Sequence, residues 1–291
     1  MVINSYAKIN LFLEITGKDN ADGYHYIDSI FQEITLCDTI EINDSLSDRV
    51  VFIDENGQTL SDDGLSRSTV HKALDLFKTR FGITDNFEVI VNKTIPVGAG
   101  LGGGSSNAGN LLCALAEKYG INRTEILKIA PEIGSDVPFF AFGGLCRVSG
   151  KGEIIAPLDS VLDDVEFIVV YPGFPVSTRV AYSFVENFGD AKGIEFFMKK
   201  SSINIDFLED FVYNRFQCIV IERDNRLSAI KSELDKRLKA RFSFMSGSGS
   251  SLVFVYKGGN EAKSDFDILR NSDFAVIYPG ARVFHCFPVY K

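Results

Sequence analysis

A run of glycines and serines between residues 96 and 108 has the composition of an anion-binding loop. It reads Pro-Val-Gly-Ala-Gly-Leu-Gly-Gly-Gly-Ser-Ser-Asn-Ala, with five glycines in seven residues: Gly98, Gly100, Gly102, Gly103 and Gly104. Glycine permits positive φ angles and close approach of the backbone to a ligand. A strand pattern precedes the run and a helical pattern follows it, so loop N–H groups and a helix N-terminus would face the same anion. Ser105 and Ser106 carry hydroxyls suited to phosphate or Mg²⁺, and we therefore predict a phosphate site.

Three familiar phosphate-binding motifs do not account for this loop. The Walker A string Gly-x4-Gly-Lys-Ser/Thr is absent, as are the HRD and DFG motifs of protein kinases. Gly98, Gly100 and Gly103 match G-x-G-x-x-G, but the nearest acids, Glu117 and Glu125, fall in helical patterns and not at the end of a strand. A dinucleotide-binding oxidoreductase and a catalytically inert nucleotide-binding module stay open as alternatives.

Other polar residues stand where they could do chemistry. Residues 8–15 alternate in polarity, which predicts a strand with Lys8 and Asn10 on its polar face. Asp136 follows a helix-ending glycine and precedes Val-Pro, which favours an extended chain. Tyr24 and His25 follow the turn-forming segment 17–23. Taken singly, each of these residues also has an ordinary structural explanation.

The elements that must position these residues are mixed along the chain. Strands are predicted over 8–15, 31–42, 87–92, 139–142, 145–148, 166–171, 252–256, 275–277 and 283–289. Helices are predicted over 69–81, through 108–116, from 122 to about 134, over 178–185 and over 227–238. The order has no strict βαβ rhythm, so the expected class is α+β. A length of 291 residues suggests about two domains, the second beginning near Pro157.

Composition and charge limit the kinds of partner, compartment and metal that the chain is suited to. The net charge is −9, with an acidic excess in residues 43–64 that is typical of a solvated hairpin and loop. No basic stripe favours nucleic acid, and no apolar run approaches the ~18 residues of a membrane span. Five scattered cysteines without CxxC spacing indicate a reduced, cytoplasmic chain, and the presence of only three histidines argues against a zinc site.

The whole 96–108 string resembles the phosphate loop of the GHMP kinases, a superfamily that includes galactokinase, homoserine kinase and mevalonate kinase. Four further segments resemble one branch of it, whose acceptor is a cytidine diphosphate sugar alcohol of isoprenoid biosynthesis. They are Ala-Lys-Ile-Asn-Leu-Phe-Leu at 7–13 with Asp-Gly-Tyr-His at 22–25, Gly-Ser-Asp-Val-Pro at 134–138, Tyr171 to Tyr182, and Met-Ser-Gly-Ser-Gly at 245–249. The matched stretches run from residue 7 to residue 256.

The resemblance implies a two-domain GHMP-kinase-like fold, with an ATP-binding domain over 1–154 and a substrate domain over 155–291. It implies transfer of the γ-phosphoryl of ATP to the acceptor's 2-hydroxyl, with Asp136 as general base and Lys8 as its partner. Ring stacking on Tyr24 and Tyr182 would bind the cytosine, with His25 at its edge. The implied ATP contacts are Lys93, Pro96, Gly98, Gly100, Gly102, Gly103, Gly104, Ser105, Ser106 and Asn107. The implied substrate contacts are Asn10, Tyr24, His25, Thr178, Tyr182 and Gly247.

The resemblance also implies Mg²⁺, held by Ser105 or Ser106 together with water and phosphate, and a monomer or homodimer. One departure concerns adenine, because Ser-Thr-Val stands at 68–70 where relatives often carry Asn-Leu-hydrophobic. The alternative within the superfamily is a homoserine or mevalonate kinase type, which the Tyr-His pair at 24–25 disfavours.

Overall fold

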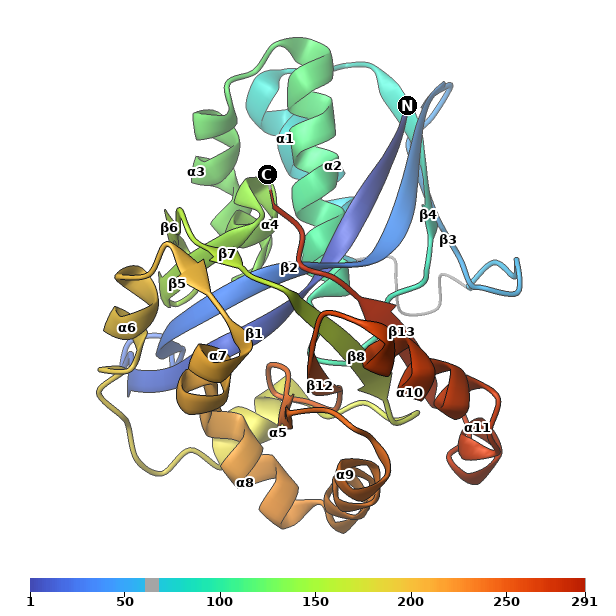
Figure 1. The fold of residues 1–291 in the computed structure, drawn as a ribbon. Coiled ribbons are helices and arrows are strands. Elements are labelled where there is room, and N and C mark those ends of the chain that lie inside the picture. The colour runs from blue at the N-terminus through green and yellow to red at the C-terminus, as the bar shows by residue number, and fades with distance from the viewer. Residues whose placement is uncertain (61–67, 291) are drawn as a thin grey trace.

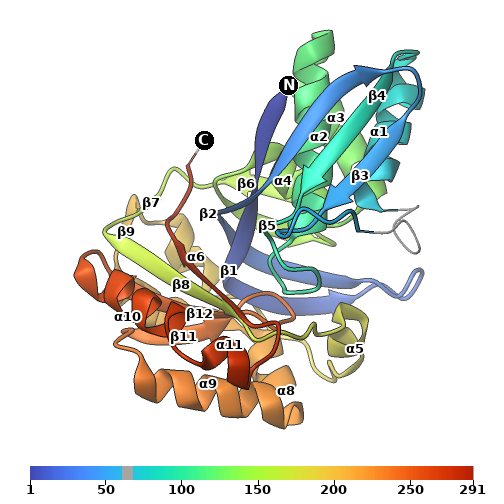
Figure 2. The ribbon, with the colours of Figure 1, turned by 90° about the vertical axis from the view of Figure 1, so that its right-hand side faces the viewer.

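The structure is a computed structural model that describes residues 1–60 and 68–290. Two long strands, β1 (Val2–Lys18) and β2 (His25–Ser45), form a bent antiparallel ribbon through the middle of the molecule (Figures 1 and 2). Its register shifts at Tyr6/Ala7, Asn10/Phe12 and Ile15/Gly17. Such irregularities increase twist and bend a strand, so one ribbon serves two regions of the fold.

The ribbon is the centre of the largest sheet. The end of β2 pairs with β4 (Asn86–Asn92), and β4 pairs with β3 (Arg49–Ile53). The start of β2 pairs with β5 (Leu145–Gly150), followed by β6 (Ile154–Pro157). On the other side, β1 pairs in parallel with β10 (Tyr213–Asn214), from the second half of the chain. The predicted boundary at 154/155 falls inside β6 and stays a prediction.

Helices α1 (Thr69–Phe81), α2 (Gly103–Tyr119) and α3 (Arg123–Ile133) pack together at one end of the molecule (Figure 1). Predicted helix 69–81 is confirmed to the residue, since Ala73, Leu74 and Phe77 form the buried stripe that its spacing indicates. Ser68 caps α1 by accepting a hydrogen bond from the backbone N–H of His71.

A second, antiparallel sheet has the order β11 (Phe242–Met245), β12 (Leu252–Lys257), β8 (Val165–Tyr171), β13 (Arg282–Cys286). Its β8 is buried on both faces, with alternate residues in two different cores. Phe167 and Val169 belong to the core that includes Ile9 of the ribbon. Ile168 and Val170 belong to the core beneath α8 (Arg215–Arg223), α9 (Asn225–Arg237) and α10 (Asn260–Arg270). The sheet therefore joins the ribbon to the second group of helices.

The remaining elements are short. They are α4 (Val137–Phe142), β7 (Val161–Leu162), α5 (Thr178–Ser183), α6 (Ile194–Met198), β9 (Ser202–Ile203), α7 (Ile205–Phe211) and α11 (Phe274–Ile277). None of the helices in the described part of the chain is both long and apolar enough to cross a bilayer.

The α+β class is confirmed, but two predicted strands are wrong. Residues 139–142 lie in α4, and 275–277 lie in α11. Residues 137–141 are all buried, and such a run shows no face by which periodicity could separate helix from strand. Pro138 stands in the first turn of α4, where its missing N–H costs no helical hydrogen bond.

The acidic segment 43–64 is mostly exposed where the structure describes it, as predicted, although residues 49–53 form β3. Asp48 pairs with Lys78 and accepts from Phe87 N at 2.9 Å, and Asp44 pairs with Lys118 at 2.5 Å. Asp62 and Asp63 lie outside the described residues.

Candidate active site

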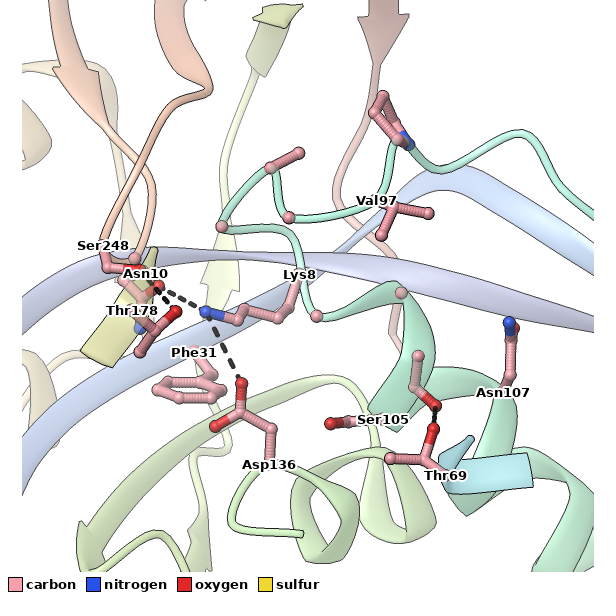
Figure 3. A pocket seen from close by; sticks show the side chains of 18 of the residues that line it. Lys8, Asn10, Phe31, Thr69, Val97, Ser105, Asn107, Asp136, Thr178 and Ser248 are labelled. Atoms are coloured by element: carbon pink, nitrogen blue, oxygen red, sulfur yellow. Dashed lines mark hydrogen bonds and ion pairs between the residues drawn. The ribbon is translucent and has the colours of Figure 1, made fainter. Parts of the chain in front are cut away.

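A cavity of about 460 Å³ lies between the glycine-rich segment, β1 and the loop after β11. Figure 3 shows the side chains of Lys8, Asn10, Asp136 and Thr178 gathered at one part of it, with Val97 and Asn107 farther off. We call it the loop cavity. It brings together residues separated by more than 200 positions, from Lys8 to Ser248.

The glycine-rich segment takes the conformations that its composition predicts. Gly98, Gly100 and Gly102 have φ of +69°, +77° and +72°, and α2 begins at Gly103. The same glycines also meet the protein closely. A Cβ on Gly102 would lie 2.7 Å from the Phe140 ring, so this position is confined by packing as well as by any ligand. Gly104 is exposed, has an ordinary helical φ and borders the cavity.

The two serines are placed differently. Ser105 borders the cavity. Ser106 is fully buried, its hydroxyl donating to Tyr6 O at 2.6 Å and lying 2.7 Å from Ser5 Oγ. Ser106 therefore holds α2 against β1, and Ser105 is the serine that a ligand in the cavity could reach.

Asn107 borders the cavity with an unsatisfied amide. The residue is 1% exposed, and neither Oδ1 nor Nδ2 of its side chain has a hydrogen-bond partner. An unpaired buried amide is costly, and a ligand in the cavity could supply the hydrogen-bond partners that the protein does not provide.

Lys93 reaches the start of α2 from the end of β4. Its Nζ pairs with the fully buried Asp38, whose Oδ1 also accepts from Thr94 N and Ile95 N at 2.7 Å each. A Cβ on Gly103 would lie 3.4 Å from Lys93 Nζ. Asp38 thus fixes both Lys93 and the entry to the loop, and Pro96 borders the cavity just beyond.

The predicted catalytic pair comes from two elements, Lys8 from β1 of the ribbon and Asp136 from the residue before α4. Lys8 Nζ donates to Asn10 Oδ1 at 2.7 Å and lies 3.9 Å from Asp136 Oδ2 (Figure 3). It also lies 4.6 Å from the centre of the Phe31 ring. Burial lowers the pKa of Lys8, and the Asp136 carboxylate offsets part of that effect by raising it. Asn10 is fully buried and donates to Ser29 Oγ at 3.1 Å, so its amide orientation is set.

A second cavity of about 700 Å³, which we call the ring cavity, adjoins the first. The residues bordering both are Ile27, Ser105, Asp136, Thr178 and Tyr182. Tyr24, 59% exposed, and His25 border the ring cavity alone. The His25 ring stacks on Tyr182 with centroids 4.8 Å apart. Burial lowers the pKa of His25, with a smaller effect in the same direction from Lys18, and both effects favour the neutral ring.

The loop after β11 closes the wall of the loop cavity. Gly247 and Ser248 border it, and Ser248 Oγ lies 2.9 Å from Thr178 Oγ1. Ser246 Oγ donates to Gly100 O at 3.0 Å, so the two glycine-containing loops touch.

Ser68 and Thr69, where the sequence departs from the usual pattern, also border the cavity. Thr69 Oγ1 donates to Gly104 O at 2.7 Å, which ties α1 to α2.

Three contributors escape prediction from the sequence. Asp38 lies in a strand pattern with no motif around it. Phe31 reads as an ordinary apolar strand residue. Lys151 donates to Asp19 at 2.7 Å and to Asp22 at 2.6 Å, anchoring the hairpin tip that carries Tyr24. In the sequence Lys151 is a single lysine between two glycines, and this pattern does not indicate a role for it.

Comparison with known proteins identifies relatives of this chain. Residues 68–144 match the GHMP kinases N terminal domain. The 4-diphosphocytidyl-2-C-methyl-D-erythritol kinase of Thermosipho melanesiensis is 36% identical over 87% of this chain and 90% of its own. The kinase of the same name from Fervidobacterium nodosum is 35% identical over 89% of this chain and 92% of its own.

Solved structures give the same result. A crystal structure of 4-(cytidine 5'-diphospho)-2C-methyl-D-erythritol kinase has a TM-score of 0.72 at 25% identity, covering 98% of this chain and 99% of its own. The mevalonate kinase of Methanococcus jannaschii, with a TM-score of 0.62 at 16% identity, covers 99% of this chain and 98% of its own and shares the fold.

The fold and the matched N-terminal domain thus define a GHMP kinase. Within that superfamily the similarity spans nearly the whole chain and both groups of helices. The chain belongs to the 4-diphosphocytidyl-2-C-methyl-D-erythritol kinase family.

Proposed function

We propose that this enzyme transfers the γ-phosphoryl group of ATP to the 2-hydroxyl of 4-diphosphocytidyl-2-C-methyl-D-erythritol, in the non-mevalonate isoprenoid pathway. The observation that carries the proposal is the junction of the two cavities at Asp136, with Lys8 Nζ 3.9 Å away. Phosphoryl transfer requires a donor and an acceptor in line, and it asks the protein mainly for positioning and charge stabilisation.

ATP occupies the loop cavity in this proposal. Its phosphates face the start of α2, where backbone N–H groups and the helix dipole favour anions. Val97 and Val70 border the part of the cavity available to the base, and the unpaired amide of Asn107 offers both a donor and an acceptor.

The site fits Mg²⁺ held largely by the nucleotide. In the described residues, no three His, Cys, Asp or Glu side chains cluster as metal ligands. Mg²⁺ at nucleotide sites keeps several waters and uses few protein ligands. Ser105 is the hydroxyl suited to hold it, and when bound it would neutralise charge on the phosphates.

The acceptor occupies the ring cavity. Tyr24 and the stacked pair of His25 and Tyr182 offer aromatic surfaces for cytosine. Because His25 covers one face of Tyr182, cytosine would stack on the ring surface that the His25–Tyr182 pair leaves open. Thr178, at the junction of both cavities, is placed to contact the acceptor near its reacting end.

The chain's own residues carry the proton chemistry. Asp136 accepts the proton of the 2-hydroxyl as that oxygen bonds to phosphorus, the bond from phosphorus to the bridging oxygen breaks, and ADP leaves. Lys8 stabilises the carboxylate and the charge on the transferred group. Asn10 holds the acceptor alcohol or Lys8 itself, to which it already bonds.

The test is ADP release with three acceptors: 4-diphosphocytidyl-2-C-methyl-D-erythritol, homoserine and mevalonate. We expect turnover with the first alone, reduced by about 10²- to 10⁴-fold in Asp136→Asn. Turnover of homoserine or mevalonate at comparable kcat/KM would refute the assignment. A cytoplasmic location and a monomer or homodimer complete the proposal, supported by the scattered cysteines of the sequence and by its lack of a membrane-span pattern.

A further inference from the structure

Asn214 joins the end of β10 to the start of α8 and is nearly fully buried. Its Oδ1 accepts from Phe216 N at 2.9 Å, which caps the helix. Its Nδ2 donates to two carbonyls of another loop, Met245 O at 2.5 Å and Gly247 O at 2.8 Å. The amide therefore has one capping bond and two bonds unrelated to capping.

The anchored loop, residues 245–249, is in contact with the reaction centre. A Cβ on Gly247 would lie 2.9 Å from Gly100 O and 3.4 Å from Lys8 Nζ. Gln217, in the first turn of α8, holds the same loop because its Oε1 accepts from Met245 N at 2.7 Å. The start of α8 thus supports this loop through three hydrogen bonds.

The anchor itself is attached to the ribbon. Asn214 is paired in the sheet with Leu13 of β1, the strand that carries Lys8 and Asn10. Strand β1 therefore fixes the position of both. Lys8 belongs to the strand, and the 245–249 loop is attached to it through the side chain of Asn214.

The geometry points to Asn214 as a positioning residue: by holding the Met245 and Gly247 carbonyls, it sets the distance between the 245–249 loop, the phosphate loop and Lys8. This inference rests on the proposed function for its kinetic consequence. A displacement of about 1 Å at a reaction centre can cost on the order of 10²-fold in rate, so loss of the anchor acts on kcat.

Asn214→Ser separates the two roles. Serine caps helices as well as asparagine does, but it is too short to bond both carbonyls. Asn204→Ser is the matched control, because Asn204 caps α7 by accepting from Phe207 N at 3.0 Å and is exposed. We expect kcat to fall by about 10- to 100-fold in Asn214→Ser with the KM for ATP within about twofold, and no change in Asn204→Ser.

Hydrogen exchange of residues 245–251, measured on the same proteins, does not depend on the acceptor. It should accelerate at least about tenfold in Asn214→Ser and not in the control. Exchange equal to the control overturns the inference, and so does faster exchange with unchanged kcat. If the wild type fails to turn over the cytidylated acceptor, the proposed function fails, while the exchange comparison still decides whether Asn214 anchors the loop.

A second pair of variants serves if Asn214→Ser does not fold. Gln217→Met removes the acceptor for Met245 N at similar volume, and Gln217→Glu keeps an acceptor oxygen. We expect faster exchange and a several-fold loss of kcat in the first and near-normal values in the second. Equal behaviour of the two variants overturns the inference.

Discussion

The Lys8–Asp136 pair allows a quantitative prediction about coupling. At 3.9 Å and an effective dielectric near 20, the attraction between the two charges is about 4 kcal/mol. The Asp136 side chain is 31% exposed, and solvent screening reduces the coupling to about 2 kcal/mol. At 1.36 kcal/mol per decade, that corresponds to about a 30-fold departure from additivity in kcat.

The measurement is a double-mutant cycle of Lys8→Met and Asp136→Asn, followed by phosphorylated product. We expect Asp136→Asn to reduce kcat by about 10²- to 10⁴-fold. The double variant should be about 30-fold faster than the product of the two single losses predicts, because each residue acts through the other. The cycle Lys231→Ala with Asp235→Asn, a pair 2.7 Å apart on α9, controls for salt bridges remote from the site. Additive losses would show that the two residues act independently and would refute this account of the site.

Three further outcomes are expected. Gly104→Val should raise the Kd for ATP at least about tenfold with little change in Tm, since Gly104 is exposed and the nearest atom to an added Cβ is Thr69 Oγ1 at 3.3 Å; unchanged affinity would remove the loop from the ATP site. Tyr24→Ala should raise the acceptor KM by about 10- to 100-fold, as stacking on a base contributes roughly 1–3 kcal/mol, whereas an unaltered KM would exclude this ring from the base site. Lys8→Met should increase the free energy of unfolding at pH 7, because the folded-state pKa of Lys8 lies below its usual 10.5 and charging the buried lysine destabilises the fold. The unfolded chain binds more protons between the lowered pKa and 10.5, so this gain in stability should shrink as the pH rises through that range. Urea unfolding of the variant across pH checks this, and a loss of stability above about 1 kcal/mol at pH 7 would contradict it.

Local structure was predictable from the sequence where the residue types themselves determine the backbone conformation or the buried face. Positive φ at Gly98, Gly100 and Gly102 follows from the density of glycines, and the apolar stripe of α1 follows from its spacing. The approach of Lys8 to Asp136 was not derivable from spacing, since the two are brought together by packing of α4 under the ribbon. Resemblance to a family supplied that pairing.

The two wrong strand predictions, and two contacts near the site that the sequence does not indicate, depend on tertiary structure. The 139–142 and 275–277 segments are apolar runs whose helical state is set by neighbours and not by their own pattern. The sequence does not distinguish Ser106 from Ser105. In the structure the Ser106 hydroxyl donates to the Tyr6 carbonyl, whereas Ser105 borders the cavity. His25 covers part of Tyr182, a contact between segments 157 residues apart that no local signal indicates.

The pairing of β1 with β10 has a consequence for the order in which the protein is made. Residues 2–18 leave the ribosome early, but Tyr213 and Asn214, which pair with their edge, follow almost 200 residues later. A hydrogen bond to β2 forms later still, because the Glu33 carbonyl accepts from Val289 N near the end of the chain. An unpaired strand edge is a template for association with other chains. The nascent N-terminal half therefore keeps an open edge at β1, the strand that bears Lys8, until Tyr213 and Asn214 have been translated.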